Sequence, residues 1–142
     1  MRITEVLKTK GDRVLTVAPD QTVAVLLDLL AEHRIGALVV SRDGATIDGI
    51  VSERDVVRGL QSRGTGLLDE TVDSIMTAEV HTCEPTTAID DLMRLMTDQR
   101  VRHVPVVVHG RLRGIVSIGD VVKHRIDELQ SERDQLTAYI TG

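Results

Sequence analysis

The sequence almost lacks aromatic residues: none of its 142 residues is Trp or Phe, and Tyr139 is the only Tyr. Proteins that hold single-stranded nucleic acids stack the bases on aromatic side chains, so a surface of this kind is excluded. The net charge of −5 also opposes neutralisation of a phosphate backbone. We therefore expect no nucleic-acid partner, and a core built from Val, Leu, Ile and Met.

Cysteine is equally scarce. Cys83 is the single cysteine, which excludes an intramolecular disulfide and a cysteine cluster for a metal ion. The histidines show no ligand spacing either, so we expect no metal site. No apolar run approaches the roughly 20 residues of a membrane span, and no signal peptide opens the chain. These absences favour a cytoplasmic protein without a membrane partner.

The chain is an internal duplication. The phrase GIVSERDVV at residues 49–57 returns as GIVSIGDVV at residues 114–122. An offset of 65 residues aligns these phrases, and an offset of 66 aligns TVAP at residues 16–19 with TCEP at residues 82–85. Seven of the ten residue pairs that start with the phrase are identical. Because solenoid arrays usually need three or more units, two long copies indicate one pseudo-symmetric domain.

Each copy has the residue pattern of a β-α-β-β-α unit. A helix with an apolar stripe precedes two β-rich runs joined by a Gly-containing turn, and a second helix begins at the Ser of the repeated phrase. The stripes are Val23, Leu26, Leu27 and Leu30 in one copy and Ile89, Leu92, Met93 and Met96 in the other, with Thr22 and Thr87 as expected N-caps. The expected strands are residues 37–41, 47–52, 104–108 and 112–117.

The duplication divides the chain into five segments. They are an N-terminal segment (1–13), a first repeat (14–62), a linker with a short helix (63–79), a second repeat (80–126), and a C-terminal helix extension and tail (127–142). The last helix continues well past its counterpart. Its apolar stripe consists of Val122, Ile126, Leu129, Leu136 and Ile140.

The repeated phrase places a hydroxyl and a carboxylate at a helix start, as Ser52 with Asp55 and as Ser117 with Asp120. One interpretation is structural, because S-x-x-D is a helix-capping arrangement. The other is a binding site, in which the hydroxyl and the free N–H groups favour a phosphate and the carboxylate accepts two ribose hydroxyl protons. The Gly of the phrase allows a close backbone approach. Retention of Gly, Ser and Asp in both copies favours the binding role.

With its flanking segments, the phrase resembles a tandem pair of cystathionine-β-synthase (CBS) domains, a Bateman module, of the stand-alone bacterial type. G-h-x-[ST]-x-x-D occurs twice, each copy follows T-x-x-P, and RVRHVPV lies at residues 100–106. The resemblance covers roughly Val14 to Arg125. It implies an α/β (α+β) fold in which two pseudo-symmetric repeats pack through their sheets. Adenosine-containing ligands are expected in the cleft between the repeats.

In such modules the phrase of one repeat faces the T-x-x-P segment of the other. In the preferred pocket, the resemblance puts Asp120 on the ribose, Ser117 toward the phosphate and Ile115 against the adenine. The other members of this pocket are Thr16, Val17, Pro19, Gly36, Ala37, Arg54, Arg102 and His103. The second pocket consists of Ile50, Ser52, Asp55, Thr82, Cys83, Pro85, Val104 and Gly119. The first is preferred because Arg54 crosses to it, whereas Gly119 offers the second no charge.

The resemblance implies a non-catalytic sensor that binds AMP, ADP, ATP or NAD, has no catalytic cofactor and signals to a separate regulated protein. Modules of this family pack through terminal helices, so we expect a homodimer. The alternative is a ligand-independent interaction scaffold with vestigial clefts. An enzyme is the weakest hypothesis, because no acid/base pair, activated nucleophile or metal set lies outside the duplicated elements. Two structural readings stay open: ion pairs of Arg102 and His103 at a surface or dimer interface, and Cys83 as a core or cleft residue.

Overall fold

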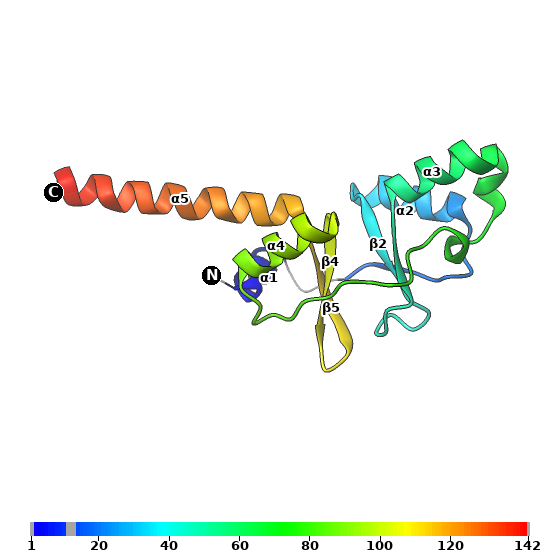
Figure 1. The fold of residues 1–142 in the computed structure, drawn as a ribbon, viewed down its shortest axis with the longest axis horizontal. Helices are drawn as coiled ribbons and strands as arrows, with labels where there is room; N and C mark the ends of the chain where they lie inside the picture. The colour runs from blue at the N-terminus through cyan, green and yellow to red at the C-terminus, as the bar shows by residue number, and fades with distance from the viewer. Residues whose placement is uncertain (1, 11–13, 142) are drawn as a thin grey trace.

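The computed structural model describes residues 2–10 and 14–141. Met1 and residues 11–13 of the expected N-terminal segment, and Gly142 of the tail, lie outside the described residues. The elements in chain order are α1 (Ile3–Lys10), β1 (Thr16–Val17), α2 (Val23–His33), β2 (Ala37–Val40), β3 (Gly49–Ser52), α3 (Glu53–Arg63), the 3₁₀ helices η1 (Gly64–Asp69) and η2 (Val72–Ser74), α4 (Ile89–Gln99), β4 (His103–Val108), β5 (Arg111–Ser117) and α5 (Ile118–Thr141). They form the expected mixed α/β fold (Figure 1).

The strands of the two units pair in equivalent registers. Each unit pairs its first extended segment in parallel with the next strand, which pairs antiparallel with the strand of the repeated phrase. The corresponding partners are Val17–Val40 with Cys83–Val106, and Ala37–Ser52 with His103–Ser117. Offsets of 66 and 65 residues relate these partners, so the structure confirms the alignment made from the sequence. The four predicted strands lie within two residues of their expected bounds.

The start of α2 confirms one predicted helix cap, and the start of α4 contradicts the other. The Thr22 hydroxyl accepts a hydrogen bond from the Val25 amide at 3.2 Å. The prediction for Thr87 is wrong, because Ala88 precedes α4 and the Thr87 hydroxyl accepts from the Glu84 amide at 3.1 Å. The offset of 66 residues places Ala88 opposite Thr22, and Thr87 therefore falls in the preceding turn.

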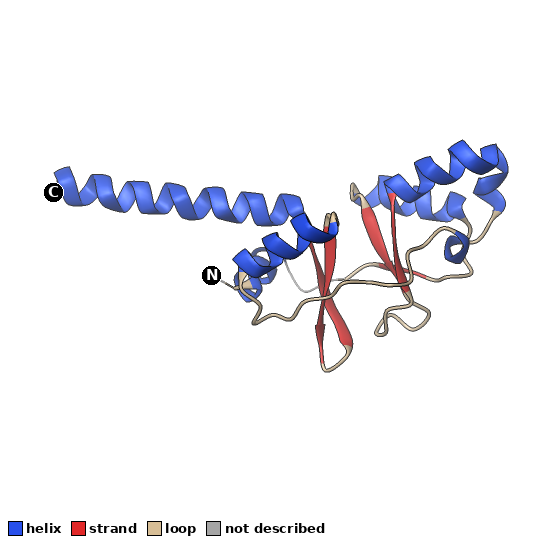
Figure 2. Ribbon diagram, in the orientation of Figure 1, coloured by secondary structure: helices blue, strands red, loops and turns tan. Residues whose placement is uncertain are grey.

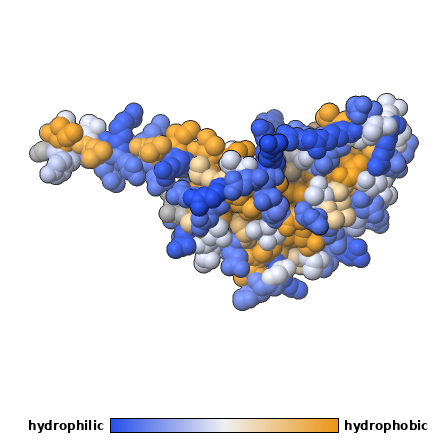
Figure 3. Space-filling view, in the orientation of Figure 1, coloured by the Kyte–Doolittle hydropathy of each residue, from blue (hydrophilic) through white to orange (hydrophobic). Residues whose placement is uncertain are grey.

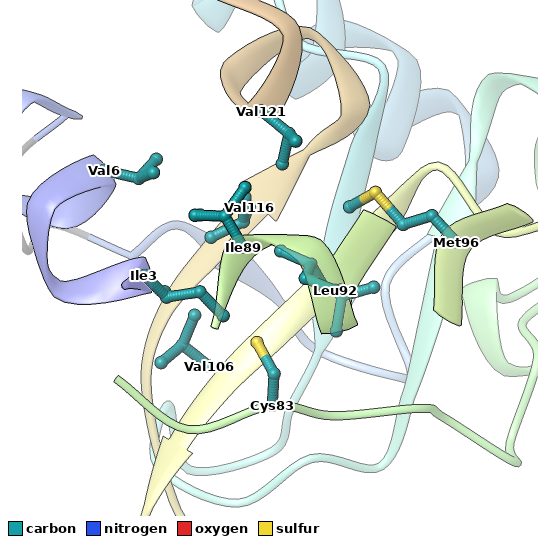
Figure 4. Close-up of a cluster of buried hydrophobic side chains, with 10 residues drawn as sticks. Ile3, Val6, Cys83, Ile89, Leu92, Met96, Val106, Val116 and Val121 are labelled. Atoms are coloured by element: carbon teal, nitrogen blue, oxygen red, sulfur yellow. The ribbon is translucent and has the colours of Figure 1, made fainter. Parts of the chain in front are cut away.

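Each unit buries its own hydrophobic core. The core of the second unit includes Ile3 and Val6 of α1, which are both almost inaccessible to solvent (Figure 4). The core of the first unit includes Val72 of η2, which lies in the linker. The segment that precedes each unit in the sequence thus covers the other unit. We call residues 2–10 and 71–79 the cover segments.

The two cover segments make equivalent backbone contacts. The Ile3 amide donates to the Thr87 carbonyl at 3.1 Å, and the Val72 amide donates to the Gln21 carbonyl at 2.8 Å. An offset of 69 residues, from Ile3 to Val72, relates the donors, whereas the offset of 66 relates the acceptors. The duplication therefore includes a short element in front of each unit.

The first Gly of each repeated phrase is required by the cover segment above it. A Cβ on Gly49 would lie 2.7 Å from Met76 Sδ and 2.8 Å from the Thr77 carbonyl oxygen. A Cβ on Gly114 would lie 2.8 Å from Leu7 Cδ2. At each of these distances the neighbouring atom would have to shift to make room for a Cβ. The glycine thus permits close packing of the chain on itself.

The sheets of the two units lie next to each other at the centre of the molecule, with α2 and α3 on one outer side and α1 and α4 on the other (Figure 1). The units are also linked by a hydrogen bond from the Leu112 amide to the Ala45 carbonyl at 2.8 Å. Helix α5 confirms the predicted extension and projects away from this body (Figure 2). Among the described residues, no helix combines the length and apolar character that a bilayer crossing requires.

Candidate functional site

The Ser and Asp of the repeated phrase cap the helices that follow it. The Asp55 carboxylate accepts hydrogen bonds from the Ser52 amide at 2.8 Å and from the Ser52 hydroxyl at 3.1 Å. The Asp120 carboxylate accepts from the Ser117 amide at 2.9 Å, and the Ser117 hydroxyl accepts from the Asp120 amide at 3.1 Å. The capping interpretation is thus confirmed in both copies. Because these bonds to the carboxylates use Oδ2 alone, capping leaves Oδ1 of each carboxylate for another donor.

A cavity of about 350 Å³ lies beside Asp55. This volume falls within the roughly 300–1,000 Å³ that is usual for small-molecule sites. Its wall is built from the ends of β2 and β3, the first two turns of α3 and the end of the cover segment at residues 71–79. Residues 100–103, before and at the start of β4, complete it. Both units therefore contribute to the same cavity.

The cavity collects residues that the sequence assigns to both expected pockets. Ile50, Ser52 and Asp55 of the second pocket line it. Five residues of the preferred pocket also line it: Gly36, Ala37, Arg54, Arg102 and His103. They meet here because β2 and β4 begin side by side, so that a Cβ on Gly36 would lie 3.7 Å from the His103 imidazole.

Several other predicted site residues have roles within the fold. Thr82, Cys83, Pro85, Val104 and Gly119 do not line the Asp55 cavity. Val17, Cys83 and Val104 are buried in the two cores, and Thr16 pairs with Val39 between β1 and β2. Burial raises the pKa of the Cys83 thiol to about 12, which opposes a reactive role.

The prolines of the two T-x-x-P segments bind the cover segments. The Pro19 carbonyl accepts from the Asp73 amide at 3.1 Å, and the Pro85 carbonyl accepts from the Thr4 amide at 3.0 Å. These contacts repeat in both units. They show that part of the T-x-x-P pattern holds the fold together.

Lys10 occupies the site around Asp120. Its ammonium nitrogen lies 2.7 Å from Asp120 Oδ2 and 2.8 Å from the Ile115 carbonyl oxygen. Burial raises the pKa of Asp120, but the hydrogen bonds from Lys10 and Ser117 outweigh it and hold that pKa below its ordinary value. The cavity beside this ion pair measures about 210 Å³, below the usual range for a small-molecule site. Sequence reasoning did not identify Lys10.

The Asp55 cavity carries an excess of basic side chains. Four arginines line it, against three acids: Arg54, Arg58, Arg100 and Arg102, and Glu53, Asp55 and Glu79. Within the described residues, none of these arginines forms an ion pair. Guanidinium groups bind phosphate oxygens through paired hydrogen bonds. Sequence reasoning missed Arg58 and Arg100, although Arg58 follows Arg54 by one helical turn and so shares its face of α3.

His103 is half-buried where the two units meet. Burial is the main cause that lowers its pKa, and the charges of Lys10 and Arg102 lower it further. The charges of Asp120 and Glu53 act in the opposite direction. The imidazole is therefore neutral at neutral pH and adds no cation to the cavity. In the part of the chain that the structure describes, no group of His, Cys, Asp and Glu side chains is suited to hold a metal ion.

Known proteins share this architecture. The sequence matches the CBS domain family twice, over residues 4–62 and 72–127. It is 38% identical over 148 residues to the mitochondrial CBS domain-containing protein CBSX3 of Arabidopsis thaliana, which covers 99% of this chain and 72% of that protein. A crystal structure of a CBS-domain-containing protein from Agrobacterium tumefaciens has a TM-score of 0.85 at 43% identity, over 88% of this chain and 99% of that chain.

A more distant structure has the same fold with adenosine derivatives bound. It is the CBS domain pair of protein MJ0100, solved in complex with 5′-methylthioadenosine and S-adenosyl-L-methionine. The TM-score is 0.77 at 22% identity, over 87% of this chain and 98% of that chain. The two family matches coincide with the two structural repeats. The chain belongs to the CBS domain family and contains two CBS domains in tandem.

Proposed function

We propose that this protein is a non-catalytic regulatory module that binds an adenosine-containing nucleotide in the Asp55 cavity and signals to a separate protein. The observation that carries the proposal is the cavity itself, which joins a capped Ser–Asp helix start to four arginines without ion-pair partners in the described residues. Since both units line the cavity, a ligand there has a binding energy that depends on their relative arrangement. That dependence is the means of signalling.

We assign the nucleotide to the Asp55 cavity, and not to the pocket preferred from the sequence, because of Arg54. The preference rested on Arg54 crossing to Asp120, and our proposal rests instead on Arg54 lining the same cavity as Asp55. In our proposal Asp55 Oδ1 accepts the ribose hydroxyls, Ile50 packs against the base, and the arginines bind the phosphates. The bound adenosine derivatives of the MJ0100 pair support the nucleoside part of this assignment.

A thermal-shift panel of AMP, ADP, ATP, NAD and S-adenosylmethionine tests the proposal. A ligand at about 100 times its dissociation constant adds about 2.7 kcal/mol to the free energy of unfolding. For a domain of this size, that gain raises Tm by roughly 10 °C. The four arginines predict larger shifts with ADP and ATP than with the cationic S-adenosylmethionine. If none of the compounds raised Tm, the proposal of nucleotide binding would be wrong.

The variants Asp55→Ala and Asp120→Ala form a matched pair, because each removes a capping carboxylate from an equivalent helix start. We expect Asp55→Ala to weaken ATP binding by about 10- to 150-fold, the equivalent of one charged hydrogen bond. Asp120→Ala should leave the affinity within a few-fold of wild type. Isothermal titration calorimetry measures both, and a larger loss in Asp120→Ala would move the site to the other pocket.

A ligand-independent interaction scaffold is the second candidate, and α5 is the observation in its favour. Hydrophobic side chains lie along the projecting helix (Figure 3), and Ile126 and Leu129 are 49% and 50% exposed. We propose that this stripe packs against a second copy of the chain in a homodimer. A scaffold would form this dimer and give no thermal shift with any nucleotide, whereas a sensor would show both properties.

A further inference from the structure

The sites at Asp55 and Asp120 are built on equivalent residues of the repeated phrase, but different groups contact the carbonyl of its Ile. In the first, the Ile50 carbonyl accepts a hydrogen bond from the Thr77 amide at 2.9 Å. In the second, the equivalent Ile115 carbonyl accepts from the Lys10 ammonium at 2.8 Å. A backbone group of one cover segment is thus replaced by a charged side chain of the other.

The charge beside the two carboxylates differs at one position of the cover segments. The offset of 69 residues that superimposes their backbone contacts places Lys10 opposite Glu79. Glu79 lines the Asp55 cavity, where its negative charge cannot pair with the carboxylate. Lys10 reaches the Asp120 carboxylate, and the paired side chains are 38% and 27% exposed. The same position therefore leaves one site open and fills the other.

We propose that Lys10 determines which of the two sites accepts a nucleotide, because its ammonium group fills the Asp120 site in place of a ligand. It neutralises the Asp120 carboxylate through Oδ2 and contacts the Ile115 carbonyl, which weakens the attraction of this carboxylate for the hydroxyl groups of a nucleoside. This inference rests on the proposed function and adds a stoichiometry to it, one nucleotide per chain at Asp55. A cation that only stabilised the end of α1 would not need to contact the Ile115 carbonyl.

Replacement of Lys10 should open the second site. A nucleotide at Asp120 must break the contacts of the Lys10 ammonium, which are partly exposed, so the cost corresponds to about a tenfold loss of affinity. Isothermal titration calorimetry with ATP, at concentrations that saturate the Asp55 site, should give one nucleotide per wild-type chain and two per Lys10→Met chain. Lys8→Met is the matched control, because Lys8 is exposed on the same short helix.

Further variants assign the new site. Lys10→Met combined with Asp120→Ala should return to one nucleotide, and Lys10→Met combined with Asp55→Ala should retain only the second. Two nucleotides per wild-type chain would overturn the inference while leaving the proposed function intact. One nucleotide per Lys10→Met chain would overturn it in the same way.

Absence of ATP binding in every variant would instead remove the proposed function, and the position of Lys10 then has its own test. Because the Lys10 charge lowers the pKa of His103, Lys10→Met should shift the NMR titration of the His103 ring to higher pH. An unchanged titration overturns the inference. A raised pKa retains Lys10 as the occupant of the Asp120 site.

Discussion

His103 lines the Asp55 cavity, and the charge of Lys10 also acts on its pKa. Its pKa is lowered chiefly by burial, so folding favours the neutral imidazole. In the unfolded chain the ring titrates at its ordinary value of 6.5. Below that pH the unfolded state binds the extra proton first, and acid therefore favours unfolding.

We predict that the free energy of unfolding falls as the pH drops from about 6.5 toward the lowered pKa of His103, and is unaffected by this group above 6.5. His103→Gln should flatten that part of the profile. Urea unfolding at pH 7.5 and 5.5 measures the slope, with His33→Gln, exposed at the end of α2, as the control. The same slope in His103→Gln and wild type would contradict the prediction.

At this scale the sequence indicated the duplicated residues and missed the unique ones. Asp55 and Asp120 could be identified because the phrase around them occurs twice. Lys10 could not, since its counterpart is Glu79 and the three residues 11–13 interrupt the alignment between its segment and the first unit. Arg54 was assigned to the Asp120 pocket by the crossing that the family resemblance implies, and in the structure it lines the cavity with Asp55.

The cover segments are the elements that distinguish this fold from two repeats packed through their sheets. Their apolar residues have matching spacing, Ile3, Val6 and Leu7 against Val72, Ile75 and Met76. In α1 this spacing belongs to a short amphipathic helix that buries Ile3 and Val6. It did not reveal which unit each segment covers, because an apolar stripe shows that a face is buried and leaves the partner open.

The two glycines beneath the cover segments should differ in their tolerance of a methyl group. Gly49→Ala would press on the Thr77 carbonyl oxygen as well as Met76, whereas Gly114→Ala meets only the end of the Leu7 side chain. Backbone moves less readily than the tip of a leucine. We expect Gly49→Ala to destabilise the fold by about 1–3 kcal/mol and Gly114→Ala by about 1 kcal/mol or less. Thermal unfolding of both variants measures the difference, and equal or reversed losses would contradict it.

The molecule as a whole consists of a two-unit body and a projecting helix. The apolar residues of α5 at Val122, Ile126, Leu129, Leu136 and Ile140 are separated by four, three, seven and four residues. Such spacing is the heptad pattern of a coiled-coil seam. Their exposed fractions rise from 47% at Val122 to 80% at Ile140, so the seam has no partner within the described part of the chain.

We predict that wild-type protein is a dimer in multi-angle light scattering and that Leu129→Glu combined with Leu136→Glu weakens the dimer at least tenfold. Two buried charges in the seam would each lack a partner. Ser131→Glu with Gln135→Glu adds the same charge away from the stripe and should leave the dimer intact. ATP binding should be unchanged in both, because no α5 residue lines the Asp55 cavity. A monomeric wild-type protein would contradict the proposed seam.

The exchange of cover segments also bears on how such a pair can arise from one unit. A chain with one repeat and the segment in front of it holds every part of a complete unit. In this protein, however, that segment lies on the other repeat. Two single-repeat chains would therefore complete their cores by exchanging cover segments, which is domain swapping. Their dimer would have the arrangement seen here within one chain. The linker between the repeats makes that reciprocal exchange intramolecular, and a repeat that has only the segment in front of it lacks part of its core.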